Sequence, residues 1–468
     1  MPELLDLPNE LVDQVVSNLS GHKTDLCNLS LVSRRVRNIT KATLYGLYSY
    51  ELFQQAYSFR PFLRTILRDP MLASYTRTAK IRVWRTAADI YSFLNEPDPP
   101  RREDLQLFVD AGRYVSLNSE PDWYESIIRG VEDAEVMLLV SQLPNLRELH
   151  LAMPPSTRLR WHFVSNEAQK ARHGLPAMYH SLTRLCVENG AGEGGFQVGT
   201  LAPFLGLPSL RIFEAYQCQS QNGLWTAANF NAFAEQNIAA FGITSINLEW
   251  SILSIEAITA LITSCKALKS FKYTHHYRAA PRLSIDQFDA RQLIKVLSRH
   301  CETLEHLELG LQSGWDPHRV QLLVHMLVAG NFRLGDLRPF RKLATLDCEQ
   351  TAFMTTTPGL QSSSRPWTEL LPTSLKKLVI RACDDDIVPC LSTLASSHKT
   401  DFPLLGKVQV TAPPRKVMSR EAEANDVWYR KEHLEDKFGP DVDFKVEEWS
   451  GYSVGLSGFI PPPPSWRS

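Results

Sequence analysis

Apolar residues recur along most of the chain in the spacing apolar-x-x-apolar-x-apolar. The last two apolar positions of each segment alternate with polar positions, which is the pattern of a β-strand with one buried face. Nine segments fit, defined by Leu146/Leu149/Leu151, Leu182/Leu185/Val187, Leu210/Phe213/Ala215, Ile243/Ile246/Leu248, Leu268/Phe271/Tyr273, Leu304/Leu307/Leu309, Leu343/Leu346/Cys348, Leu375/Leu378/Ile380 and Leu405/Val408/Val410. Weaker copies lie at Ile81/Val83 and Phe444/Val446. The pattern therefore predicts a series of short strands.

Helical patterns fill several of the gaps between these segments. From the segment that ends at Leu151 to the one that ends at Val410, successive segments are 25 to 39 residues apart. Residues 254–264, 284–300 and 316–328 have the apolar spacing of helices. A strand and a helix that repeat in this way resemble a leucine-rich repeat solenoid, with parallel strands on the concave face and helices on the convex face. The expected fold class is α/β, and the repeat is irregular because the gaps exceed the usual length of roughly 20–29 residues.

Leucine-rich repeats often carry Asn or Cys three residues after the last strand leucine. Cys218 and Cys383 occupy this place. Four other hydrogen-bonding residues could partly replace it in their own units: Ser251, His276, Gln312 and Thr351.

The first 48 residues carry a helical pattern instead. Leu11, Val15 and Leu19 line one face of a first helix, and Val12 and Val16 line a second face beside it. Three short helices are too small to bury all of this surface. We expect Val12 and Val16 to be left over, and a leftover apolar patch on a small module usually marks a partner surface.

Capping signals divide this stretch into its helices. Pro8 suits the first turn of the first helix, because its missing N–H is not needed there. Thr24 or Asp25 can cap the second helix, and Ser33 can cap the third.

The N-terminal stretch resembles the F-box. The shared pattern is Leu7-Pro8-x-Glu10-Leu11, then Val15 or Val16, Leu19, Asp25-Leu26, Leu29 and the run Leu31-Val32-Ser33-Arg34. The resemblance implies docking on the Skp-type adaptor of a cullin–RING ubiquitin ligase, with the rest of the chain selecting a target protein. The residues it assigns to adaptor binding are Leu7, Pro8, Glu10, Leu11, Val12, Val15, Val16, Leu19, Leu26, Leu29, Val32 and Arg34. With its irregular repeats, the chain most resembles fungal F-box proteins.

These patterns divide the chain into four parts. We expect an F-box over 1–48, a helical connector over 49–74, a leucine-rich repeat-like solenoid over 75–460 and a proline-rich tail over 461–468. Within the solenoid, loops are expected at 95–104 and 154–176, and a charged helix at 419–438 followed by a closing strand.

Composition narrows the functional classes. The 468 residues are 44% hydrophobic and carry a formal net charge of −1, which gives no support for binding nucleic acid or an acidic membrane. There is no apolar run of the roughly 18 residues that a membrane span needs. The acidic N-terminus is unlike a secretory signal, and the eight scattered cysteines suit reduced thiols. We therefore expect a cytoplasmic and/or nuclear protein.

Candidate catalytic motifs are weak. Residues 190–195 match G-x-G-x-x-G and Glu214 follows at the distance of a dinucleotide-binding fingerprint, but Phe196 does not open a helix. His275 and His276 have no neighbouring Cys, His or Asp cluster at ligand spacing. We expect no catalytic residue, no metal and no cofactor.

A protein-binding face is the remaining expectation. Polar and aromatic side chains between and just after the strand leucines suit protein recognition. The candidates for target binding are Arg82, Trp84, His150, Glu214, Tyr216, Asn247, Trp250, Lys272, Glu308 and Asp347.

Three alternatives stay open. One is an adaptor-bound scaffold that does not lead to ubiquitin transfer. Another is a small-molecule sensor, which a basic cluster on the concave face would support, although Arg82 and Lys272 are the only basic candidates there. The third is an oxidoreductase that uses the glycine-rich loop.

Overall fold

A computed structural model describes most of the chain, in two compact units, Met1–Phe213 and Glu214–Ser468. The described residues are 6–50, 59–81, 84, 86, 99–115, 117, 122–154, 157, 161–190, 195–220, 239–276, 289–312, 333–353, 367–383, 386–412 and 430–448. Among them, no helix is long and apolar enough to cross a membrane.

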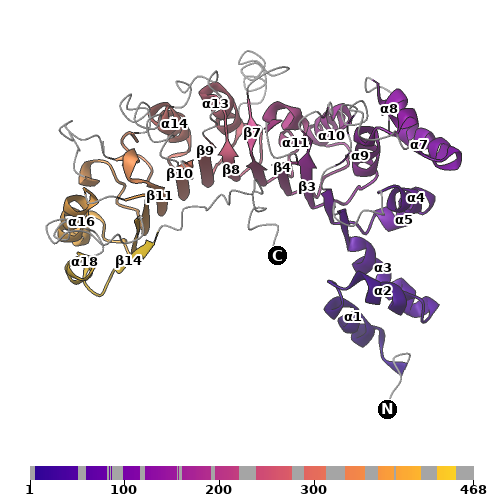
Figure 1. Ribbon diagram of the computed structural model, residues 1–468, viewed down its shortest axis with the longest axis horizontal. Coiled ribbons are helices and arrows are strands. Elements are labelled where there is room, and N and C mark those ends of the chain that lie inside the picture. The colour runs from indigo at the N-terminus through magenta and orange to yellow at the C-terminus, as the bar shows by residue number, and fades with distance from the viewer. Residues whose placement is uncertain are drawn as a thin grey trace. The chain divides into compact units, whose positions relative to one another are not determined.

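The first unit begins with three helices and continues as a parallel sheet (Figure 1). Its helices are α1 (Asn9–Asn18), α2 (Lys23–Ser30), α3 (Arg34–Gly46), α4 (Arg60–Arg68), α5 (Pro70–Ala73), α7 (Arg102–Tyr114), α8 (Trp123–Arg129), α9 (Glu132–Ser141), α10 (His162–Arg172) and α11 (Ala202–Leu205), with a 3-10 turn at Val198–Leu201. Its strands are β1 (Leu47–Tyr50), β2 (Thr78–Ile81), β3 (Glu148–Met153), β4 (Arg184–Asn189) and β5 (Phe196–Gln197), while β6 (Ile212–Tyr216) lies across the unit boundary. Strands β1 to β4 pair in parallel, in chain order.

The second unit has the same plan. Its strands are β7 (Cys218–Gln219), β8 (Ser245–Ser251), β9 (Ser270–His276), β10 (His306–Gln312), β11 (Thr345–Glu349), β12 (Lys377–Arg381), β13 (Lys407–Ala412) and β14 (Asp443–Glu448). Its helices are α13 (Ile255–Ser264), α14 (Ala290–Leu297), α16 (Ile387–Asp401) and α18 (Lys431–Phe438), with 3-10 turns at Ser298–His300, Gln350–Ala352 and Trp367–Glu369. Strands β8 to β14 are parallel neighbours in chain order, and α13 and α14 lie on one side of them (Figure 1).

The strand predictions are confirmed. Each of the nine apolar segments contains a strand, and the second and third apolar residues of each are buried. The weaker copy at Phe444/Val446 is β14, and β2 ends at Ile81, while Val83 lies outside the described residues. The alternation of apolar and polar residues locates these strands, because only one face of each strand packs against the core. Strand β1 was not predicted, because it follows α3 without a break.

The helix predictions have mixed outcomes. Residues 254–264 form α13 as predicted, and α14 lies within 284–300. The predicted helix at 316–328 and the tail at 461–468 lie outside the described residues. Residues 154–176 were predicted to be an insertion or a loop, and a loop is wrong for His162–Arg172, because α10 lies there and buries Phe163 and Val164. Its few apolar residues stand among charged ones, so the helical period is weak.

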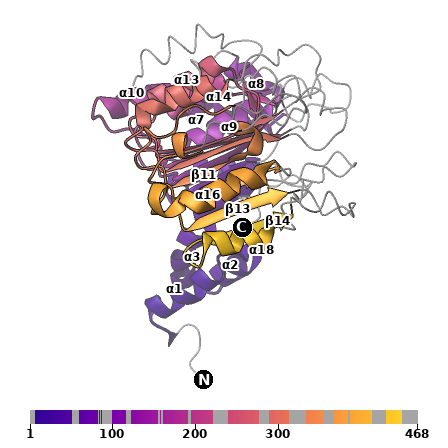
Figure 2. The same cartoon turned by 90° about the vertical axis from the view of Figure 1, so that its left-hand side faces the viewer.

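The last strand ends the sheet of the second unit as expected for a closing element. Helix α18, which forms the second half of the charged helix predicted over 419–438, packs against α16 and β14 (Figure 2). The Phe438 ring stacks on Phe444 with centroids 5.2 Å apart and lies 5.7 Å from His398. This contact covers the apolar end of the sheet.

Hydrogen bonds after the strands resemble the expected repeat chemistry. The Cys218 backbone N–H donates to Ser251 Oγ at 3.3 Å, and Ser251 Oγ donates to the Glu249 carbonyl at 3.0 Å. Ser251, the last residue of β8, therefore makes hydrogen bonds to β7 and within its own strand.

Candidate functional site: two interaction surfaces

The core of the N-terminal helices corrects the sequence interpretation. Val12, Val16, Leu26 and Val36 form a buried cluster. The prediction that Val12 and Val16 are left over is therefore wrong, because both side chains are fully buried within the three-helix module itself. They pack against Leu26 of α2 and Val36 of α3.

The exposed apolar face of α1 is instead formed by Leu11 and Val15, which are 44% and 37% exposed. These residues are four apart, so they lie on one face of the helix. The sequence places two apolar stripes side by side on α1, and periodicity alone does not say which stripe meets α2 and α3. The three-helix packing selects Val12 and Val16 for the core.

A second exposed apolar pair lies in the turn between α2 and α3. Leu31 is 71% exposed and Val32 is 52% exposed. Ser33 holds this turn as predicted, since its side chain accepts from the Val36 N–H at 3.1 Å. The predicted cap of α2 is wrong: the helix begins at Lys23 with no side-chain cap. Leu31 was missed as a contact residue, although it opens the Leu-Val-Ser-Arg run.

The other predicted adaptor-binding residues differ in exposure. Pro8, Glu10 and Arg34 are exposed. Three leucines are partly buried at the edge of the core: Leu7, Leu19 and Leu29. Arg35 fixes the start of α1, because its Nε donates to Asn9 Oδ1 at 2.8 Å and its Nη2 donates to the Leu7 carbonyl.

The three-helix module is tied to the sheet of its own unit. Helix α3 runs into β1, and Thr76 Oγ1 donates to the Tyr45 carbonyl at 3.0 Å. The Tyr48 and Phe62 rings stack with centroids 4.2 Å apart. Helices α4 and α5 lie in the stretch predicted as a connector, and they pack beside this junction.

Two ion pairs fix α4 to the helices that follow. Arg60 Nε donates to both carboxylate oxygens of the fully buried Glu135 at 2.9 Å. Arg64 Nε donates to Asp104 Oδ1 at 2.6 Å. Arg60 and Glu135 are both buried, and removing one partner of such a pair leaves an uncompensated buried charge, whereas Arg64 is partly exposed.

The target-binding candidates of the first unit are largely buried. Trp84 is 2% exposed and its Nε1 donates to Asp133 Oδ1 at 2.6 Å. His150 is 4% exposed, and burial lowers its pKa. The prediction that Trp84 and His150 present an open surface is wrong, and Arg82 lies outside the described residues.

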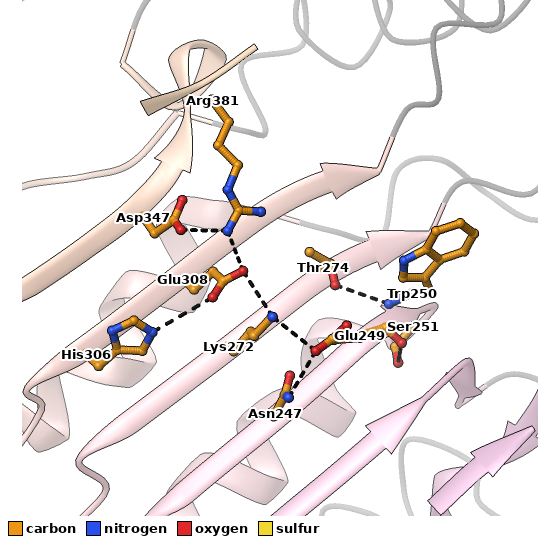
Figure 3. Close-up of polar contacts among 10 residues, drawn as sticks. All are labelled: Asn247, Glu249, Trp250, Ser251, Lys272, Thr274, His306, Glu308, Asp347 and Arg381. Carbon is orange, nitrogen blue, oxygen red and sulfur yellow. Dashed lines mark hydrogen bonds and ion pairs between the residues drawn. The ribbon is translucent and has the colours of Figure 1, made fainter. Parts of the chain in front are cut away.

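The candidates of the second unit do come together. Asn247, Lys272, Glu308 and Asp347 lie in register on the adjacent strands β8 to β11. Figure 3 shows their side chains on the side of the strands away from the helices. We call this surface the polar face; it comprises Asn247, Glu249, Lys272, Glu308, Asp347, Glu349 and Arg381.

A chain of ion pairs runs across the polar face. Lys272 Nζ lies 3.0 Å from Glu249 Oε1 and 3.2 Å from Glu308 Oε1. Arg381 Nη2 lies 2.5 Å from Glu308 Oε1 and 2.6 Å from Asp347 Oδ2. Each cation is therefore held between two carboxylates (Figure 3).

Arg381 was missed by the sequence analysis. It lies on β12 and reaches across β11 to Glu308 on β10. Gly310 leaves room for Thr274, because a Cβ there would lie only 2.8 Å from Thr274 Cγ2, whereas its distance of 3.8 Å from Arg381 Nη1 would be an ordinary contact. The available signal was the alternation of β12, which places Arg381 two residues after Val379 on the same face.

The two central carboxylates differ in their proton affinity. Burial alone would raise the pKa of Glu308, but contacts with His306, Lys272 and Arg381 outweigh burial and lower its pKa to about 2. Burial raises the pKa of Asp347, and the nearby charge of Glu308 adds to that rise against the opposing effect of Arg381. Glu308 is thus the anion around which both cations are arranged.

An aromatic pair lies beside the polar face. The centroids of the Tyr216 and Trp250 rings are 5.9 Å apart. The backbone N–H of Trp250 donates to Thr274 Oγ1 at 3.2 Å. Trp250 has a left-handed backbone, φ 52°, where the register of β8 shifts. Such a conformation costs a bulky residue about 1–3 kcal/mol, so the surrounding hydrogen bonds must hold it. Glu214 is half-buried on β6.

The alternative chemistries gain no support. Among the described residues, no group of three His, Cys, Asp or Glu side chains could hold a metal ion. Phe196, which follows the glycine-rich segment, lies in the short strand β5 and not at the start of a helix. The dinucleotide-binding arrangement requires that helix.

Comparison with known proteins identifies the N-terminal module. The family model of the F-box domain matches residues 4–43, which cover α1, α2 and most of α3. A search of curated proteins found no match to the chain. The chain therefore carries an F-box domain, the module that typically binds Skp-type adaptors and that supports, in general terms, the role of a substrate receptor in an SCF ubiquitin ligase.

Proposed function

We propose that this protein is the substrate receptor of an SCF-type cullin–RING ubiquitin ligase and has no catalytic site of its own. The F-box domain docks on the Skp-type adaptor, and the repeat region binds a target protein that the ligase modifies. The observation that carries the proposal is the exposed apolar surface of an F-box domain whose core is already filled: Leu11, Val15, Leu31 and Val32.

This surface supplies the docking energy. Full burial of one Val or Leu side chain contributes about 1.5–3 kcal/mol. We place Leu11, Val15, Leu31 and Val32 at the centre of the interface, and the exposed Pro8, Glu10 and Arg34 at its rim. Val12, Val16 and Leu26 are buried in the core beneath this surface, and they pack the helices that carry it.

The repeat region is proposed to be an irregular leucine-rich repeat solenoid of the type found in fungal F-box proteins. Parallel strands in chain order, helices on one side and the Cys218–Ser251 hydrogen bond support this assignment. The target binds the polar face and the neighbouring Tyr216 and Trp250.

The attachment of the F-box supports the same role. The α3–β1 junction and the hydrogen bond from Thr76 Oγ1 to the Tyr45 carbonyl join the end of the F-box to the first strands of its own unit. A receptor gains from a fixed geometry, because the effective concentration of one site near another depends on the link between them.

Affinity purification from cells tests the proposal. The double variant Leu11→Ser/Val15→Ser should lose the adaptor and the cullin while retaining target proteins. Asp13→Ser is the matched control, because Asp13 lies about 200° around α1 from Leu11. Unchanged recovery of the adaptor by the double variant contradicts the proposal. A target half-life that does not depend on the protein identifies an adaptor-bound scaffold instead.

A further inference from the structure

Lysines gather near the starts of the last three strands of the second unit. Lys377, Lys407 and Lys445 lie on the neighbouring strands β12, β13 and β14. The residue that follows each of them is buried, so the three lysines lie on the opposite face of the sheet. We call these residues, together with the exposed Lys376 just before β12, the lysine patch.

Two lysines of the patch are direct neighbours. Lys377 and Lys407 are paired in register on β12 and β13. Neighbouring strands lie about 4.8 Å apart, and like charges that face each other across this distance destabilise a sheet. The stability of the fold therefore does not explain this placement, and an anionic partner would relieve the repulsion.

Among the described residues, a single carboxylate forms ion pairs with the lysine patch. Asp443 Oδ2 lies 3.8 Å from Lys407 Nζ and 3.2 Å from Lys445 Nζ, so one oxygen serves two cations. Within the same part of the chain, Lys376 and Lys377 have no ion pair. The patch therefore has more positive charge than its own strands compensate.

Other carboxylates near the patch are engaged elsewhere. Glu447 Oε2 accepts from Gln409 Nε2 at 2.7 Å, and Asp441 Oδ2 lies 3.5 Å from Lys399 Nζ. The Asp443 side chain is 49% exposed, and ion pairs at exposed sites are weak and screened by salt. A partner's carboxylate can therefore replace Asp443 at little cost, in contrast to the polar face, where each cation lies between two carboxylates.

An exposed leucine lies at the edge of the lysine patch. Leu404 is 54% exposed in the turn that leads into β13. Two residues later, the Gly406 backbone N–H donates to the Lys376 carbonyl at 3.0 Å, so this turn lies against the start of β12. Apolar surface beside cations suits a protein segment that carries both acidic and apolar side chains.

We propose that the lysine patch binds an acidic segment of the target protein. Its carboxylates contact Lys376, Lys377 and Lys407, and one of its apolar side chains packs on Leu404. The inference rests on the proposed function, since it names the chemistry of a target that the repeat region binds. It adds a contact surface on β12 to β14 to the polar face.

The type of cation favours carboxylates over a phosphate group. The patch consists of ammonium groups spread over three strands, whereas bidentate recognition of one phosphate relies on a guanidinium. The arginine of β12, Arg381, is already bound to Glu308 and Asp347. Separate point charges suit the several carboxylates of an extended acidic segment.

Fluorescence anisotropy on the full chain tests the inference with two labelled heptapeptides. One has a leucine between two runs of three glutamates, and the other replaces each run with phosphoserine, glycine and phosphoserine. We expect the glutamate peptide to bind more tightly than the phosphoserine peptide, with an affinity that falls as salt is added. Lys377→Gln/Lys407→Gln should weaken its binding about tenfold and leave the melting temperature unchanged or higher, because two like charges are removed. Leu404→Ser should weaken it about threefold.

Lys266→Gln/Lys295→Gln is the matched control, since it removes the same charge from the turn before β9 and from α14. We expect its affinity for the glutamate peptide to stay within about twofold of wild type. Equal weakening in both double variants overturns the inference, because it shows general attraction to basic surface.

Three further results would also overturn it: no binding of the glutamate peptide to wild type, tighter binding of the phosphoserine peptide at the same lysines, or no loss in Leu404→Ser. Adaptor capture, which depends on Leu11 and Val15, is measured separately. Failure here and failure of the proposed function are therefore distinguishable.

Discussion

The F-box domain and the polar face are two surfaces that we propose to bind partners, and they differ in how far their interactions are satisfied within the chain. On the F-box, the core formed by Val12 and Val16 is complete, and Leu11 and Val15 have apolar surface still to bury. On the polar face, Lys272 and Arg381 are held by carboxylates before any partner arrives.

This difference has consequences for affinity and for specificity. Burial of exposed apolar groups stabilises a complex with little dependence on the geometry of the contact. We therefore expect the F-box surface to contribute free energy of binding. A charge that enters the polar face would compete with existing ion pairs, so we expect that surface to contribute to the choice of partner more than to the strength of binding.

The largest expected effect on stability comes from the centre of the polar face. Glu308 has a folded-state pKa of about 2, below its ordinary value of 4.5, so its contribution is present above pH 4.5 and is lost as the pH falls toward 2. Glu308→Gln should therefore lower the free energy of unfolding at pH 7 by about 2–3 kcal/mol. Urea denaturation between pH 2 and pH 7 measures this, and the difference from wild type should shrink across the acid limb.

Asp347→Asn is the matched comparison, because the pKa of Asp347 is raised and its ionised form opposes folding at neutral pH. We expect Asp347→Asn to be neutral or slightly stabilising at pH 7. An equal loss in both variants would contradict the assignment of Glu308 as the anchor of the ion pairs.

A smaller effect on stability distinguishes the two apolar stripes of α1, one with Val12 and Val16 and the other with Leu11 and Val15. Val16→Ala removes buried methyl groups and should destabilise the F-box domain by about 2 kcal/mol, whereas Val15→Ala should stay within about 0.5 kcal/mol of wild type. Adaptor affinity should change in the opposite order, with the larger loss in Val15→Ala. Thermal denaturation and adaptor titration of both variants measure the two effects, and a greater stability loss in Val15→Ala would reverse the assignment of core and surface.

The sequence was sufficient for the strands that carry the apolar segments, but not for β1, and it predicted the surfaces less well. Leu307, Leu346 and Leu378 are fully buried where the apolar spacing predicts them, because a strand has two faces and alternation fixes which one is inside. On α1, the apolar stripes of Leu11 and Val12 are adjacent, so the choice between them depends on contacts with α2 and α3.

The ion-pair chain was partly predictable for a related reason. Lys272, Glu308 and Asp347 were placed on one face by alternation, but register alone does not show that Arg381 crosses a whole strand to reach Glu308. Trp84 and His150 were misplaced, because alternation gives the face of a strand and does not say what covers that face; Trp84, for example, donates to Asp133 of α9.

The most direct test is the dissociation constant between the purified protein and a Skp-type adaptor, measured by titration calorimetry for wild type and Leu11→Asp. The proposed interface predicts at least about a hundredfold weaker binding with an unchanged melting temperature, because a charge would be buried at the centre of the contact while the F-box core is untouched. Binding within about twofold of wild type, from a folded variant, would contradict it.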